Sequence, residues 1–174
     1  MDERLLAGSP REGRISRLRR WTLLPLSIGA ILLQVYLPLF FESLSRLELP
    51  LLVTLYFALL RRNPVSGLLA GAAIGLAQDS LSHQPLGMFG IVKTLVGYFA
   101  ASISMRFDVE HFAVRFLLAG SFFFFHQFFY WVLARALLGQ QLGFDAGATL
   151  LFGLLNAAVA VLLFHFFDKL KERG

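Results

Sequence analysis

Long apolar stretches, each ended by a short polar segment, run along almost the whole chain. The core of a bilayer is about 30 Å thick, so a helix needs about 20 predominantly apolar residues to cross it. On this pattern we predict six transmembrane helices, at positions 21–41, 49–60, 64–81, 86–105, 112–138 and 146–167. Membrane-spanning strands alternate apolar and polar positions, whereas these stretches are continuously apolar. The pattern therefore predicts an all-α integral membrane protein that folds as a six-helix transmembrane bundle.

The second stretch, 49–60, is short for a span. It reaches the required length only if it begins near Leu44 and carries Glu48 at the membrane interface. Arg61 and Arg62 end the stretch. The Asn-Pro pair that follows predicts a tight turn, because the residue before a proline avoids the helical conformation. We expect the third helix to begin with this proline.

The composition agrees with a membrane protein. Of the 174 residues, 57% are hydrophobic and 16% are charged, whereas about a quarter are charged in ordinary soluble domains. This excludes a water-soluble globular domain. Six spans leave no room for a separate catalytic domain, so we predict one transmembrane domain, 21–168, between a basic tail, 1–20, and a short tail, 169–174. The absence of cysteine excludes disulfides, iron–sulfur clusters and thiol catalysis.

The basic residues predict the orientation. Six spans place both termini on one face, and 13 of the 16 Lys and Arg residues then fall on that face, which is cytoplasmic by the positive-inside rule. Dropping the second stretch would move many of them to the other face. The net charge of +5 therefore reflects topology and gives no reason to expect nucleic acid. The basic residues expected at the membrane surface, where they attract anionic lipid, are Arg14, Arg17, Arg19, Arg20, Arg61 and Arg62.

Three glycines form a ridge on the third helix. Gly67, Gly71 and Gly75 recur every four residues, so they lie on one face and allow another helix backbone to approach closely. The spacing does not say whether that helix belongs to this chain or to a partner. We favour packing within the chain, because most such ridges in multi-span bundles are internal.

Ionisable residues flank the turn between the third and fourth helices. Asp79 lies at the end of the third helix and Lys93 lies about two turns into the fourth. Charges at membrane depth need a partner, hydration or a route to the surface. The hairpin either pairs the two charges, or leaves Asp79 hydrated while Lys93 extends to the interface. With Gln78 and His83, they form a polar notch that is a candidate partner or substrate site.

The same turn contains residue types found in hydrolases, namely Asp79, Ser80, Ser82 and His83. The sequence has no nucleophile elbow, no HExxH motif and no further carboxylate and histidine with metal-ligand spacing. We therefore expect neither catalysis nor a metal or cofactor. Residues of this kind usually cap a helix at the interface.

His126 lies within a run of aromatic residues in the fifth helix. A buried neutral histidine usually forms a hydrogen bond to another helix. We expect Asn156 of the sixth helix to be its partner, and we see no chain of acids that would make a proton relay.

Short motifs follow one another between residues 48 and 98. They are Glu48-Leu49-Pro50-Leu51-Leu52, Arg61-Arg62, the glycines from Gly67 to Gly75, Leu76-Ala77-Gln78-Asp79, Pro85-Leu86-Gly87 and Gly97-Tyr98. In their order and spacing, and in the length, the six short-looped spans and the basic start, the chain resembles the rod shape-determining protein MreD family. The positions that the resemblance marks as important are Pro50, Gly75, Asp79, Pro85, Gly87 and Tyr98.

The resemblance implies a non-enzymatic membrane component of the bacterial cell-wall elongation complex, the elongasome. Such a protein would lie in the cell inner membrane and maintain rod shape by supporting peptidoglycan synthesis. The implied partners are MreC, MreB, and the synthase pair of RodA and penicillin-binding protein 2. The implied fold is similar to the substrate-binding membrane subunits of energy-coupling-factor transporters. A small-molecule-binding subunit of such a transporter is therefore the alternative function.

Overall fold

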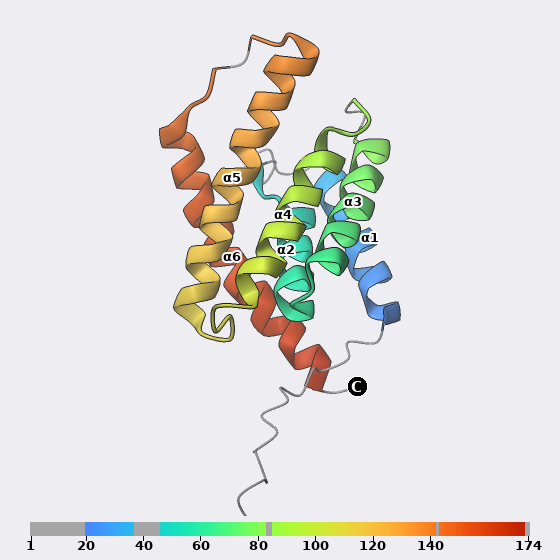
Figure 1. Ribbon diagram of the computed structural model, residues 1–174, viewed down its shortest axis with the longest axis vertical. Coiled ribbons are helices and arrows are strands. Elements are labelled where there is room, and N and C mark those ends of the chain that lie inside the picture. Colours follow the sequence, from blue (N-terminus) through green and yellow to red (C-terminus); the bar gives the residue numbers. More distant parts are fainter. Residues whose placement is uncertain (1–19, 37–45, 83–84, 142, 173–174) are drawn as a thin grey trace, which may run out of the picture.

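The computed structural model describes residues 20–36, 46–82, 85–141 and 143–172. These residues form helices and no strand, which confirms the all-α prediction (Figure 1). The six helices are α1 (Arg20–Tyr36), α2 (Leu49–Arg61), α3 (Pro64–Leu81), α4 (Met88–Ser104), α5 (Phe112–Leu138) and α6 (Ala146–Glu172). Arg14, Arg17, Arg19, Leu44 and His83, together with the predicted end of the first span at 37–41, lie outside the described residues.

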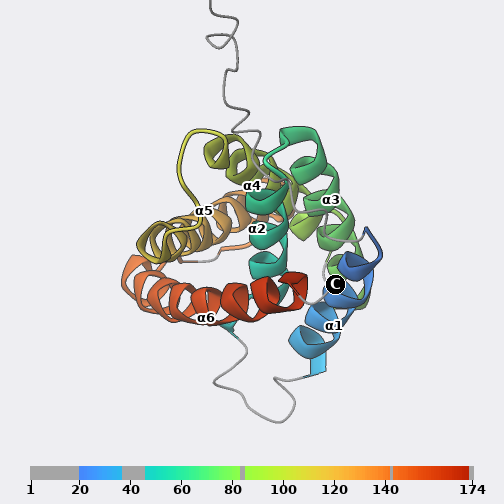
Figure 2. The same cartoon turned by 90° about the horizontal axis from the view of Figure 1, so that it is seen from below.

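The shortest helix, α2, occupies the centre of the bundle. Seen along the bundle, the other helices surround it (Figure 2). Every residue from Pro50 to Leu59 is buried, as expected for a helix that is apolar on all sides. Its 13 residues extend about 20 Å at 1.5 Å per residue. The short stretch therefore does not need to begin near Leu44: α2 begins at Leu49, and its first turn lies inside the bundle.

Local sequence explains where the neighbouring helices begin and end. Arg62 ends α2 in the left-handed conformation, and its N–H donates to the carbonyl of Ala58 at 3.2 Å. Asn63 then caps α3, because its side chain accepts the N–H of Ser66 at 3.0 Å, and Pro64 follows as the first helical residue. As predicted, α3 begins with the proline, and α2 and α3 are joined by a tight turn.

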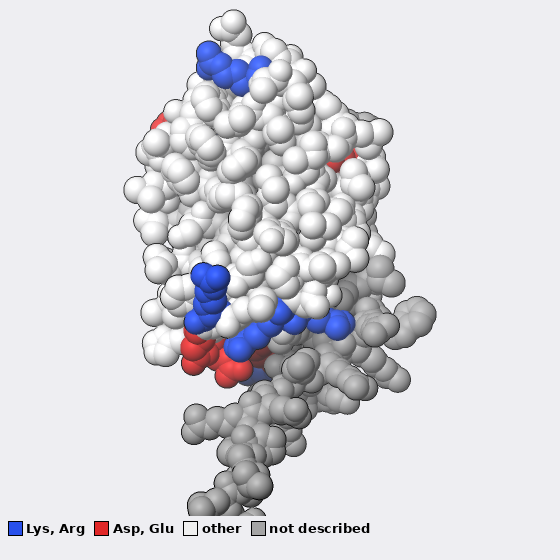
Figure 3. Space-filling model, viewed as in Figure 1, with Lys and Arg blue, Asp and Glu red and all other residues white. Residues whose placement is uncertain are grey.

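The polarity of the molecule is inverted relative to a soluble protein. Lys93 is fully buried, whereas Leu162 is 73% exposed. Large apolar side chains are exposed on helices all around the bundle, among them Leu32, Leu69, Ile91, Leu117 and Leu162. In the view of Figure 3 the charged residues gather toward the two ends, and the broad belt between them is uncharged. Such a belt is suited to lipid.

Two helices, α5 and α6, are long and apolar enough to cross a membrane on their own. They run antiparallel at one side of the bundle (Figure 1). The stretches Pro25–Tyr36, Leu49–Arg61 and Met88–Ser104 are apolar but shorter.

Candidate functional site: a buried polar core

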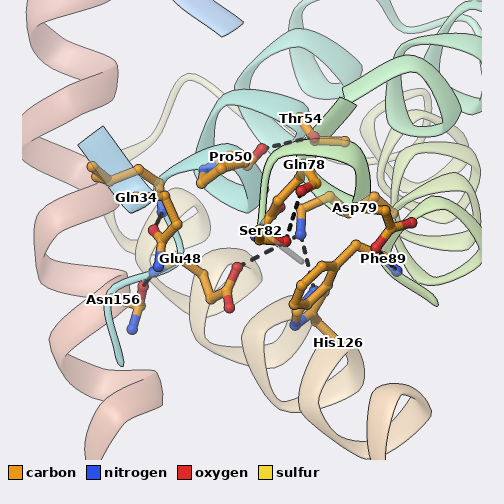
Figure 4. A network of polar contacts seen from close by, with 12 residues as sticks. Gln34, Glu48, Pro50, Thr54, Gln78, Asp79, Ser82, Phe89, His126 and Asn156 are labelled. Atoms are coloured by element: carbon orange, nitrogen blue, oxygen red, sulfur yellow. Dashed lines mark hydrogen bonds and ion pairs between the residues drawn. The ribbon is translucent and has the colours of Figure 1, made fainter. Parts of the chain in front are cut away.

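Eight polar or charged residues are buried among the described residues, and we call six of them, all except Thr54 and Ser104, the polar core. These six come from the segment before α2 and from four helices, and Figure 4 shows them with their neighbours. The polar core consists of Glu48, Gln78, Asp79, Lys93, His126 and Asn156. Buried charges are costly unless they are paired and hydrogen-bonded, so their contacts determine what the site can do.

Asp79 is the N-terminal cap of α4. Its carboxylate accepts the backbone N–H groups of Gly87 at 2.9 Å, Phe89 at 3.0 Å and Gly90 at 3.0 Å. The residue at the cap position, Gly87, has no side chain to do this, and its φ of +99° is one that glycine adopts readily. A carboxylate at a helix N-terminus also interacts favourably with the helix dipole. Asp79 therefore joins the end of α3 to the start of α4.

Lys93 contacts α5 and the residue before α2. Its Nζ lies 3.6 Å from Oε2 of Glu48 and 3.2 Å from Nε2 of His126. It also lies 4.4 Å from the centre of the Phe89 ring, a cation–π distance. An ammonium group can only donate hydrogen bonds, so Nε2 of His126 is the acceptor in this contact. Lys93 thus connects three separate parts of the fold.

These contacts correct both hypotheses about the notch. No ion pair joins Asp79 to Lys93, although both are described, and both are buried, so Asp79 is not a hydrated interfacial residue and Lys93 does not extend to the surface. The carboxylate of Asp79 is held by the N-terminus of α4, and the ammonium of Lys93 is held by Glu48. Glu48, expected at the interface, is therefore a buried member of the core.

Asn156 holds the N-terminus of α2. Its Oδ1 accepts the N–H of Glu48 at 2.9 Å, and its Nδ2 donates to the carbonyls of Arg46 at 3.1 Å and Phe152 at 2.8 Å. The prediction of a hydrogen bond between His126 and Asn156 is wrong. His126 contacts Lys93, and Asn156 binds backbone groups.

Gln34 of α1 satisfies the next donor of α2, accepting the N–H of Leu49 at 3.0 Å. Pro50 follows and has no N–H to satisfy. The buried start of α2 is thus capped by side chains from α1 and α6, which explains how a helix can begin inside the bundle.

The glycine ridge faces α4. A Cβ on Gly67 would overlap the carbonyl of Gly97, one on Gly71 the carbonyl of Lys93, and one on Gly75 the carbonyl of Phe89. The structure therefore places this ridge against a helix of the same chain. Because Gly71 touches the backbone of Lys93, the ridge also fixes the position of the buried lysine.

The remaining candidate residues lie apart from the polar core. Tyr98 is 43% exposed on α4, beside Phe99. Pro85 is exposed in the turn, where its carbonyl accepts the N–H of Met88 at 3.3 Å. The guanidinium of Arg61 lies over the ring of Phe57 at 5.3 Å. The side chain of Arg20 lies outside the described side chains.

A second polar contact, at the other end of α2, was not singled out from the sequence. Asp168 accepts Nη1 of Arg115 at 2.6 Å and the hydroxyl of Tyr56 at 3.0 Å. It joins α2, the start of α5 and the end of α6. Opposite charges at adjoining ends of antiparallel helices were the available signal.

The geometry gives no support to a hydrolase. The hydroxyls of Ser80 and Ser82 donate to carbonyls of their own helix, Leu76 at 2.9 Å and Gln78 at 2.7 Å. Within the described part of the chain, no three His, Asp or Glu side chains are grouped to hold a metal ion. Three buried atoms, Oε2 of Glu48, Oε1 of Gln78 and Nδ1 of His126, make no hydrogen bond to described protein atoms.

An apolar exterior around a buried polar core, with two helices long enough to span, indicates an all-helical membrane protein. The model of the rod shape-determining protein MreD family matches residues 15–173. The chain therefore belongs to this family, which confirms the resemblance and assigns it a role in cell-shape determination. The curated proteins and the solved structures contain no match to the chain.

Proposed function

We propose that the chain is a non-enzymatic scaffold of the bacterial cell-wall elongation complex. Its proposed direct partner is MreC, with MreB, RodA and penicillin-binding protein 2 as further members of the assembly. Besides the family assignment, this proposal is carried by one observation: side chains of the polar core are bound within the chain. Asp79, Lys93 and Asn156 bind other parts of the same chain, so they hold helices together instead of presenting a reactive group.

We further propose six spans in the cytoplasmic membrane, with both termini cytoplasmic. Two polar contacts support alternating helix directions. Asp168 brings together the later part of α2, the start of α5 and the end of α6. At the opposite end of α2, Gln34 binds Leu49. The basic residues of the α2–α3 turn and of the two tails, including Arg14, Arg17, Arg19 and Arg20, then face the cytoplasm and anionic lipid.

In this proposal, most of the candidate residues are structural. Pro50, Gly87 and the glycine ridge determine how the helices pack, and Asp79 and Lys93 connect helices through polar contacts. Tyr98 is exposed on α4 and is therefore the proposed contact with a partner helix. The family assignment does not favour the alternative of a transporter subunit.

Depletion in a rod-shaped host, with rescue from a plasmid, tests the scaffold role. We expect depleted cells to become round or swollen and the wild-type chain to restore rods. Purification in mild detergent should retain MreC. Normal rods after verified depletion would contradict the proposal, and recovery of an ATPase module in place of MreC would favour the transporter subunit.

A further inference from the structure

One face of α5 carries an uninterrupted stripe that ends in a cation. Leu117, Ser121, Phe124, Phe128, Trp131 and Arg135 follow one another at alternating spacings of four and three residues, which keeps them on one side of a helix. Most of this stripe is outside the bundle, because Leu117 is 68% exposed and Phe124 and Phe128 are each 40% exposed. The exposed Arg135 lies in the last turn of α5.

The first three residues of the stripe, Leu117, Ser121 and Phe124, line an apolar groove between α5 and α6. The groove has a volume of about 380 Å³, within the range of small-molecule sites. Small residues form part of its lining, and the larger ones are apolar. The groove is lined by Phe116, Leu117, Gly120, Ser121, Phe124, Thr149, Leu150, Gly153 and Leu154.

Phe144 continues this surface from the groove toward Arg135. Its ring lies 5.7 Å from Phe124, 6.0 Å from Phe128 and 5.7 Å from Trp131. The guanidinium of Arg135 in turn lies 5.7 Å from the ring of Trp131. Apolar groove, aromatic surface and cation therefore follow one another along α5. Figure 3 shows a patch of Lys or Arg atoms at the end of the molecule where α5 ends.

The dimensions and the charge fit a phospholipid. Arg135 lies 11 positions after Phe124 on the helix, a rise of about 17 Å, and one leaflet of the hydrocarbon core is about 15 Å deep. The groove therefore begins about 2 Å beyond that depth, and an extended acyl chain that hangs from a headgroup at Arg135 reaches its near end, at Phe124. Arg binds phosphate through paired N–H donors, and aromatic residues such as Trp131 are typical of the membrane interface.

We propose that the α5–α6 groove and Arg135 bind one anionic phospholipid, with an acyl chain in the groove and the phosphate against the guanidinium. The inference rests on the proposed placement in a membrane, and it does not depend on the scaffold role. It assigns the outer end of α5 a lipid contact that is separate from the basic tail on the opposite face.

Fluorescence quenching of Trp131 tests the site directly. The protein has two tryptophans, so Trp21→Phe leaves Trp131 as the reporter. The full chain in mild detergent is titrated with phosphatidylglycerol brominated in its acyl chains, and separately with brominated phosphatidylcholine. We expect half-maximal quenching at a concentration at least fivefold lower for phosphatidylglycerol, and loss of this difference in Arg135→Gln.

Two further variants separate the possible occupants. Ser121→Phe fills the groove from its exposed side and should weaken quenching at least fivefold, whereas Arg106→Gln, an exposed arginine of the α4–α5 loop, should change nothing. Equal quenching by the two lipids, or unchanged quenching in Arg135→Gln, would overturn the proposal. Loss of MreC from Ser121→Phe with unchanged quenching would assign the groove to a partner helix and also overturn it. Arg135→Gln should still retain MreC. A loss of lipid selectivity in a variant that retains MreC is then distinct from a failure of the scaffold role.

Discussion

Lys93 of α4 and Glu48, the residue before α2, form a buried ion pair with 3.6 Å between Nζ and Oε2. The Lys93 side chain is fully buried and the Glu48 side chain is 11% exposed, and Lys93 has a further contact with Nε2 of His126 at 3.2 Å. The pair connects the start of the central helix to α4, whose backbone is already held against α3 by Gly71. Its removal should therefore affect the packing of three helices at once.

A double-mutant cycle measures this pair. Glu48→Gln and Lys93→Met each leave one buried charge without its partner, and such single changes cost about 3 to 5 kcal/mol in other proteins. The double variant removes both charges, so we expect it to be clearly more stable than the sum of the single effects predicts. The free energy of unfolding in detergent is the measurement.

The matched cycle pairs Lys93→Met with Asp79→Asn. Because Asp79 binds the start of α4 and not the ammonium group, its coupling to Lys93 should be the smaller of the two. A larger coupling to Asp79 than to Glu48 would contradict the arrangement described here.

Asp79→Ala should destabilise the protein more than an ordinary loss of a helix cap. Such losses cost about 0.5 to 2 kcal/mol, but here three backbone N–H groups lose their acceptor in a largely buried position. Asp79→Asn keeps one acceptor and should be intermediate. The control is Asp145→Ala, which removes an exposed cap of α6 that accepts the N–H of Ala148 at 2.9 Å. Thermal unfolding that is equal for the two alanine variants would contradict a special role for Asp79.

The sequence was sufficient for the helices, but not for the burial of the charges. Apolar runs and the Asn-Pro turn predict the helices because these features act locally. The four-residue spacing of glycines predicts a close helix contact, and the structure places it against α4. The sequence also marked Asp79 and Lys93, since ionisable residues in apolar helices rarely lack a role.

The partners of these charges could not be predicted in the same way. The approach of Glu48 to Lys93 depends on how the central helix packs, and this is a tertiary property without a local pattern. The capping role of Asp79 does have a local signal in the sequence. Gly87 opens the next helix without a capping side chain, and a carboxylate one short turn earlier is well placed to replace it. The missing cap of α4 therefore predicts the partner of Asp79 better than its opposite charge to Lys93 does.

The proposed topology predicts opposite locations for two reporter fusions. A reporter at Gly174 should be active on the cytoplasmic side, and one inserted at Gln84, in the α3–α4 turn, should be active on the outer side. The reason is the 13 of 16 basic residues that six spans place with the termini. Alkaline phosphatase and green fluorescent protein fusions give complementary readouts, and the same location for both sites would rule out six spans.

Gly71→Leu should prevent α3 and α4 from packing. A side chain at this position meets the carbonyl of Lys93, which belongs to a helix backbone and cannot rotate away. Overpacking of a core commonly costs about 1 to 3 kcal/mol, occasionally more, and displacement of Lys93 from Glu48 should add to this. We expect a large loss of folded protein, measured by size-exclusion chromatography and thermal unfolding. The matched control is Gly29→Leu on α1, where a Cβ has no neighbour within 4 Å. Similar behaviour of the two variants, with Gly71→Leu folded and still bound to MreC, would show that the ridge does not determine the helix contact.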